Sequence, residues 1–168
     1  VMPISKKSDG WYWGSKGPFA TKQKAIDVGR AAHASGYKEG ADMLDKNATA
    51  QFVGTLLHSA TLAHFKHFQV EGVGSDAAHR ALADYYDAIP DLVDTVTESI
   101  QGAYEELVEP YPSAFGNVDR DPLEYIRGLR DYVRQERTKL PQDSEIQNEI
   151  DGLATLLNRT VYRLKFLK

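Results

Sequence analysis

Four of the five histidines lie between His58 and His79, and a series of spaced carboxylates follows them. The first stretch reads H-x5-H-x2-H-F-Q-V-E-G, and the second reads H-R-A-L-A-D-Y-Y-D-A-I-P-D-L-V-D-T-V-T-E. Imidazole nitrogens and carboxylate oxygens on neighbouring helices are ligands that iron and zinc accept in proteins. The pattern indicates a candidate metal site. Whether the histidines and carboxylates come close together depends on how the helices that carry them are arranged.

Length and composition narrow the protein class. With 168 residues, 42% hydrophobic and 26% charged, the chain has the composition of a soluble globular protein with one main core. The net charge of −4 does not point to nucleic acid or an anionic membrane, and the absence of cysteine excludes disulfides and thiolate metal sites. No apolar run approaches the roughly 20 residues of a membrane span, and no signal peptide is visible. The start at Val1 is expected of a processed protein or of a cloning boundary.

Residues 1–46 are interpreted as a basic, aromatic N-terminal arm. The density of glycine and proline between Asp9 and Phe19 disfavours regular structure there. A short helix from Thr21 to Ala34 is expected to follow, with Thr21 as N-cap and Gly36 ending it. The large aromatic side chains of the arm are expected to bind a partner, with packing against the chain's own helices as the alternative. These residues are Trp11, Tyr12, Trp13 and Phe19.

Residues 47–168 show helical spacing of apolar residues throughout and predict a four-helix bundle. Asp121 is expected to cap the third helix with Pro122 at its first position, and Pro90 is expected to kink the second. The expected helices are Thr49–Val70, Ser75–Leu107 (capped by Ser75 or Asp76), Asp121–Leu140 and Asp143–Phe166.

Loop lengths favour two helical hairpins joined by a long crossover. The loops Glu71–Gly74 and Pro141–Gln142 are short, so each joins antiparallel neighbours. The connection Val108–Arg120 could span about 43 Å at ~3.3 Å per residue, close to the ~45 Å length of a thirty-residue helix. This all-α arrangement is ferritin-like, with an up-down-up-down bundle as the alternative.

The first hairpin resembles the mini-ferritins that protect DNA during starvation. In that family a histidine followed by tryptophan ends the first helix, a histidine opens the second, and D-x3-E follows to form the ferroxidase site. The corresponding residues here are His67 (before Phe68), His79, Asp94 and Glu98. The family's additional aspartate four residues after the second histidine is replaced by Ala83, which departs from the two-iron pattern.

The same hairpin also resembles ferritin-like proteins of unknown function from tailed bacteriophages. The shared pattern is H-x2-H-[aromatic or Leu]-Q, then H-x-A-L-x2-[FY]-Y-[DS]-x-I-x-D-L-V-D-x3-E and a closing Q-G. It runs from His64 to Gly102, a stretch of 39 residues. This resemblance implies a phage protein, located in the virion head or the host cytoplasm, and cleavage by a head-maturation protease would account for Val1.

Helix geometry limits how the candidate ligands can combine. In an antiparallel hairpin, His67 lies beside residue 78 or 79, so His64 can join His67 and His79 within one chain. Asp94 lies about 22 Å from His79 along a helix, at ~1.5 Å per residue. Only a second copy related by two-fold symmetry could bring Asp94 and Glu98 to His67. The acidic residues on this helix have a simpler alternative as a solvated face; they are Asp84, Asp87, Asp91, Asp94, Glu98 and Glu105.

Two functions are expected from these observations. The first is a non-enzymatic virion or head component that self-associates through the bundle and docks on other virion proteins through the arm. The second is a mini-ferritin-like protein that binds iron or zinc at His67, His79, Asp94 and Glu98, with His64 nearby. No catalytic residue is assigned, because the chain contains no Walker loop, G-x-G-x2-G or G-x-S-x-G motif. Nucleic acid is a less favoured partner of the basic arm.

Overall fold

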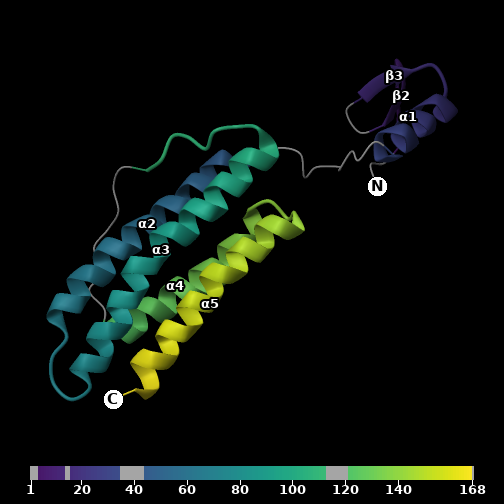
Figure 1. Ribbon diagram of the computed structural model, residues 1–168. Helices are drawn as coiled ribbons and strands as arrows, with labels where there is room; N and C mark the ends of the chain where they lie inside the picture. Colours follow the sequence, from purple (N-terminus) through teal and green to yellow (C-terminus); the bar gives the residue numbers. More distant parts are fainter. Residues whose placement is uncertain (1–3, 14–15, 35–43, 113–120, 168) are drawn as a thin grey trace. The chain divides into compact units, whose positions relative to one another are not determined.

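The chain separates into two compact units. The computed structural model describes residues 4–13, 16–34, 44–112 and 121–167, and its units are Val1–Met43 and Leu44–Lys168 (Figure 1). The sequence-based boundary lay between residues 46 and 47. The expectations about Val1 and Gly36 fall outside the described residues.

The N-terminal unit is a three-stranded antiparallel sheet with one helix. The strands β1 (Ile4–Lys7), β2 (Gly10–Trp13) and β3 (Lys16–Phe19) follow one another in chain order across the sheet. Helix α1 spans Lys22–Ala34, and its N-cap is the expected Thr21, whose hydroxyl accepts a hydrogen bond from the Lys24 amide. The expectation that this region lacks regular structure was wrong.

The glycines that suggested irregular structure allow the strands to approach closely. Gly10 and Gly17 both have positive φ angles, near +150°, which other residues rarely adopt. A Cβ atom on Gly17 would lie 2.7 Å from Cδ1 of Tyr12, and one on Gly10 would lie 2.8 Å from Cβ of Pro18. The composition of this segment therefore reflects tight strand contacts, which a count of glycine and proline cannot distinguish from loops.

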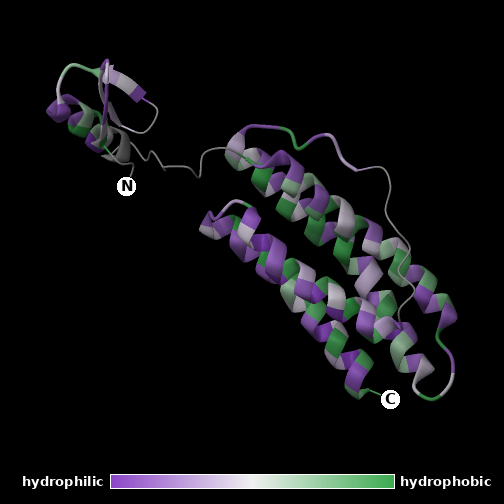
Figure 2. Ribbon diagram, turned by 180° about the vertical axis from the view of Figure 1, so that it is seen from behind, coloured by the Kyte–Doolittle hydropathy of each residue, from purple (hydrophilic) through white to green (hydrophobic). Residues whose placement is uncertain are grey.

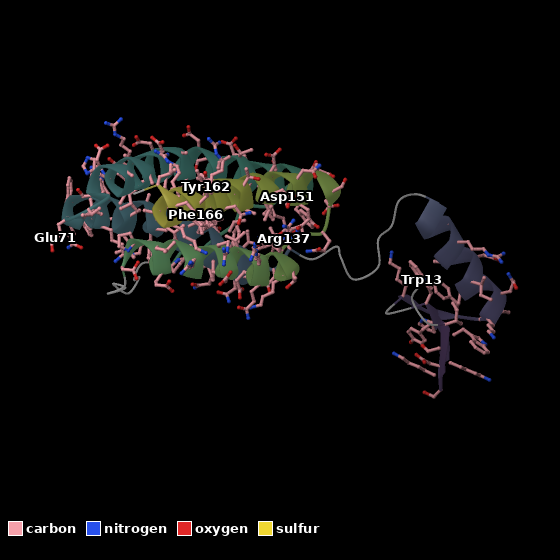
Figure 3. All side chains as sticks on the ribbon, turned by 90° about the horizontal axis from the view of Figure 1, so that it is seen from below. Trp13, Glu71, Arg137, Asp151, Tyr162 and Phe166 are labelled. Carbon is pink, nitrogen blue, oxygen red and sulfur yellow. The ribbon has the colours of Figure 1, made fainter. Side chains whose placement is uncertain are left out.

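Trp13 forms the core of the N-terminal unit. Its side chain is 2% exposed and lies between the sheet and α1 (Figure 3). A Cβ atom on Gly29 of α1 would lie 2.7 Å from Nε1 of Trp13. Trp13 is therefore not available at the surface for a partner, which corrects its assignment as a docking residue. Trp11, Tyr12 and Phe19 are half-buried.

The second unit consists of four packed helices that share one hydrophobic core. Hydrophobic and hydrophilic residues alternate along each helix (Figure 2), and the hydrophobic ones supply the buried side chains. Leu56 of the first helix, Ile89 of the second, Ile126 of the third and Leu153 of the fourth are fully buried. The helices are α2 (Lys46–Gln69), α3 (Ser75–Tyr104), α4 (Pro122–Glu136, extended by the 3₁₀ helix η1, Arg137–Lys139) and α5 (Ser144–Phe166).

The ends of these helices partly follow the sequence signals. Asp121 accepts hydrogen bonds from the amides of Leu123 and Glu124, and Pro122 takes the first position of α4. Helix α3 differs, because its N-cap position is Gly74 and no side chain caps it. It continues through Pro90 and ends before Glu105, which has a left-handed conformation.

The relative directions of the four helices follow from which helix ends lie together at one end of the bundle. The end of α2, the start of α3, the start of α4 and the end of α5 line one cleft of about 410 Å³. Helices α3 and α4 therefore run in the same direction (Figure 1), so the end of α3 and the start of α4 lie at opposite ends of the bundle. At the opposite end, Arg137 donates hydrogen bonds to Gln147 and Asp151 and joins η1 to α5 (Figure 3). The chain is thus mostly helical, as expected, with a small sheet that was not expected.

A buried polar pair links α2 and α3. The Ser59 hydroxyl donates to the Leu56 carbonyl, so the Tyr85 hydroxyl, 2.7 Å away, donates to Ser59. Both residues are completely buried, and this burial raises the pKa of Tyr85 well above its usual value. The pair satisfies two hydroxyls inside an otherwise apolar core.

Removing the Ser59 hydroxyl should reduce the free energy of unfolding more than removing the Tyr85 hydroxyl. Ser59→Ala leaves the buried Tyr85 hydroxyl without an acceptor and should cost about 1–3 kcal/mol, whereas Tyr85→Phe leaves Ser59 bonded and should cost about 1 kcal/mol. Denaturant unfolding followed by far-ultraviolet circular dichroism measures both. Equal losses would show that the hydrogen bond is not made as described.

Gly29→Ala should destabilise the N-terminal unit by about 1–3 kcal/mol, because the new methyl group overlaps the Trp13 indole. Both tryptophans of the chain lie in this unit, so thermal unfolding followed by tryptophan fluorescence reports on it. Gly152→Ala in α5 is the matched control, since its Cβ would make an ordinary 3.6 Å contact with Leu92. It should leave the fluorescence transition unchanged and stabilise the bundle by about 0.5–1 kcal/mol, followed by far-ultraviolet circular dichroism. A neutral Gly29→Ala would contradict the packing of Trp13.

Candidate functional site

His67 and His79 come together at the closed end of the α2–α3 hairpin. His67 lies in the last turn of α2, and His79 lies near the start of α3. Their ring centroids are 3.5 Å apart, with a tilt of 28° between the rings. His67 is 8% exposed, whereas His79 is exposed to solvent. The two histidines that the sequence pairs as ligands are therefore direct neighbours within one chain.

Reciprocal hydrogen bonds hold the two imidazoles. Nδ1 of His67 lies 3.0 Å from the His79 carbonyl oxygen, and Nδ1 of His79 lies 3.2 Å from the His67 carbonyl oxygen. Because a carbonyl oxygen only accepts hydrogen bonds, each Nδ1 carries the proton, and the lone pair of each neutral ring is on Nε2. Metal-binding histidines are commonly oriented by such a backbone contact through the other ring nitrogen. In this tautomer of the neutral rings, the Nε2 atoms are the ones that a metal could bind.

His64 belongs to an aromatic cluster beside this pair. Its ring stacks on Tyr86 with centroids 4.1 Å apart, and it lies 4.8 Å from Phe68 and 5.7 Å from His67. Phe68, whose ring also lies 5.5 Å from His67, is 71% exposed. Sequence reasoning assigned no role to Tyr86. Its position seven residues after His79, two turns along the same side of α3, was the available signal.

Asp94 and Glu98 lie far from the histidine pair within the same chain. Fifteen residues separate His79 from Asp94, which corresponds to about 22 Å along α3. Both carboxylates are exposed. At about 100° per residue, Asp94 lies about 60° around α3 from His79, and Glu98 lies about 100° from it. Within the described residues, no three histidines or carboxylates lie close enough together to hold a metal ion. One chain therefore supplies His67 and His79 at one place and Asp94 and Glu98 at another.

The remainder of the acidic face is mixed in character. Asp84 forms an ion pair with Arg163 of α5, so it stabilises the bundle and is not available as a ligand. Asp87 and Asp91 are exposed. Burial, and then the negative charge of Asp94, raise the pKa of Tyr111. The exposed carboxylates of this face without a described ion pair are thus Asp87, Asp91, Asp94, Glu98 and Glu105.

This arrangement has the donors of a metal site but needs ligands from outside the chain. Two imidazoles alone bind iron or zinc weakly, and sites for these ions use three or more protein ligands. Ala83 contributes no donor. None of the helices in the described part of the chain has the length and apolarity needed to cross a membrane.

Comparisons with known proteins place the chain in a family. No curated protein and no solved structure matches the sequence. A family described as a family of unknown function, DUF5856, matches residues 67–164. The match begins at His67, includes His79, Asp94 and Glu98, and does not include the N-terminal unit. Because it spans more than half of the sequence, this chain belongs to the DUF5856 family.

Proposed function

We propose that the chain is a ferritin-like bundle that pairs with a second copy through the outer face of α2 and α3 and binds metal between the copies. The observation that carries the proposal is the His67–His79 pair, whose reciprocal hydrogen bonds leave both Nε2 lone pairs for a ligand. The partner's contribution would be the carboxylates Asp94 and Glu98, which lie on the solvent-exposed side of α3.

The helix directions support the ferritin-like part of the proposal. Helices α3 and α4 run in the same direction, so the end of α3 and the start of α4 lie at opposite ends of the bundle. Two hairpins joined by such a crossover are the arrangement of ferritin-like bundles and not of up-down-up-down bundles.

Two-fold symmetry supplies the missing ligands by simple geometry. If two α3 helices cross antiparallel at the point midway between His79 and Asp94, each histidine pair faces the carboxylates of the other copy. The midpoint falls at Tyr86 and Asp87. Tyr86 is stacked on His64, next to the exposed Phe68, so the surface near the midpoint presents aromatic side chains that association would cover.

The chemistry of the donors indicates which ions would bind. Imidazole with carboxylate suits Fe²⁺ and Zn²⁺, and the absence of thiolates disfavours softer ions. In the ferroxidase reaction, Fe²⁺ is the substrate and gives an electron to an oxidant. In this chain His67 and His79 would bind and orient the ion, while Asp94 and Glu98 would balance its charge. Their metal-bound states depend on deprotonation, so metal affinity should fall at acidic pH.

A structural role without metal is the second candidate. In it the chain is a phage virion or head component that self-associates through the same face and docks on other virion proteins through its N-terminal unit. The observations that favour it are the alanine at position 83 and the lack of three clustered donors within the described residues of one chain. Both candidates require self-association, so metal binding separates them.

Light scattering on the purified full chain, with metal analysis of the same peak, tests the proposal. We expect an even-numbered oligomer that carries iron or zinc after incubation with Fe²⁺ or Zn²⁺. Asp94→Asn and His67→Asn should each reduce bound metal at least tenfold, since each removes one ligand of a small set.

Asp91→Asn is the matched control, because Asp91 is an exposed carboxylate one turn away on the same helix. It should leave metal content unchanged. An oligomer that binds no metal would favour the structural candidate, and a monomer would exclude both. Equal loss of metal in Asp91→Asn and Asp94→Asn would indicate nonspecific binding to the acidic face.

A further inference from the structure

The N-terminal unit and the bundle carry opposite charge. Residues 4–34 contain six lysines and arginines against two aspartates, whereas residues 44–168 contain thirteen against twenty acidic residues. The two aspartates have local partners: Asp9 accepts from the Tyr12 hydroxyl at 2.7 Å, and Asp27 accepts from the Gln23 amide at 2.8 Å. The unit thus presents positive charge to solvent, through the exposed side chains of Lys6, Lys7, Lys16, Lys22 and Lys24.

Two of these lysines converge on one aromatic ring. The ammonium of Lys6, directly across the β1–β2 ladder, lies 5.5 Å from the Trp11 ring centroid. The ammonium of Lys22, at the first turn of α1, lies 5.7 Å from the same ring. Trp11 is half-buried, so part of the indole remains accessible. Lys22 is the first residue of α1, and the amino end of a helix carries the positive end of its dipole.

A ligand for this site needs negative charge next to a flat ring. Single-stranded nucleic acid has both, since its bases stack on aromatic side chains and its phosphates bind lysine. We propose that the Trp11 site binds single-stranded nucleic acid, with a base stacked on the indole and phosphates neutralised by Lys6 and Lys22. An acidic protein segment offers carboxylates without the ring, and duplex DNA keeps its bases paired. The binding of polyglutamate and of a duplex therefore distinguishes these two alternatives.

Tryptophan fluorescence reports on this site directly. The chain has two tryptophans, and Trp13 is buried, so quenching by a stacked base comes from Trp11. We expect an oligothymidylate of about twenty nucleotides to quench the tryptophan fluorescence of the full chain saturably at 50 mM NaCl. Trp11→Phe should abolish the quenching while a fluorescein-labelled oligonucleotide still binds, and Trp11→Ala should weaken binding about tenfold.

The lysines are tested by salt dependence. Lys6→Gln and Lys22→Gln should each weaken binding and lower the slope of log K against log salt concentration by about 0.7. Lys165→Gln is the matched control, because Lys165 lies 4.9 Å from the Phe166 ring on the bundle. The Lys165→Gln variant should bind the oligonucleotide with the same affinity and the same salt dependence as the unchanged chain. The lysine variants also keep the test decisive if Trp11→Ala unfolds the unit.

Three results would overturn the proposal. The first is the absence of saturable binding at 50 mM NaCl. The second is equal binding of polyglutamate or of a duplex of the same length without quenching, which would indicate an acidic protein partner or backbone contact alone. The third is an effect of Lys165→Gln as large as that of Lys22→Gln. Because none of these measurements involves metal, their outcome is independent of the metal site proposed for the bundle.

Discussion

The reciprocal hydrogen bonds between His67 and His79 are the constraint on which the α2–α3 hairpin depends. Each ring donates to the other residue's backbone carbonyl, so the contact requires one register of the two helices. In that register the Tyr85 hydroxyl meets Ser59 in the core, and the Tyr86 ring meets His64 at the surface. A slip by one residue would lose both contacts and rotate the carboxylates of α3 away from the side that His79 occupies.

The segment that follows α3 makes contacts with residues of α3 itself. The Val108 amide donates to the Gln101 side chain, and Val108 is buried. Burial, and then the negative charge of Asp94, raise the pKa of Tyr111. The chain that leaves α3 therefore turns back along the helix it has just completed, as the common direction of α3 and α4 requires. Leu107 and Tyr111 remain 66% and 46% exposed, and with Phe68 they are apolar side chains that association of two copies would remove from water.

Helical periodicity predicted the bundle well, and local backbone geometry explains what was missed. The caps at Thr21 and Asp121 follow from side-chain chemistry that sequence displays directly. The N-terminal sheet was missed because its strands have four residues each, and glycines that allow close strand contact look like loop residues. The burial of Trp13 depends on Gly29, sixteen positions later, which no local pattern reveals.

The proximity of His67 and His79 was predicted from hairpin geometry, and their hydrogen bonds were not. The acceptors are backbone carbonyls, which every residue has, so residue types carry no signal for them. The separation of Asp94 from His79 was also predicted, because distance along a helix depends only on residue number. The position of a second copy cannot be derived from one chain. The proposed metal site requires that two copies pair through their α2–α3 faces.

A single introduced cysteine tests that claim most directly, since the natural chain has none. Asp87 is exposed and lies at the midpoint between His79 and Asp94, where two copies related by the proposed symmetry would bring the same residue together. Under mild oxidation, Asp87→Cys should form a disulfide-linked dimer much faster than Asp76→Cys, an exposed position at the start of α3. Equal rates for the two variants, or no dimer from Asp87→Cys, would contradict the pairing of α2–α3 faces.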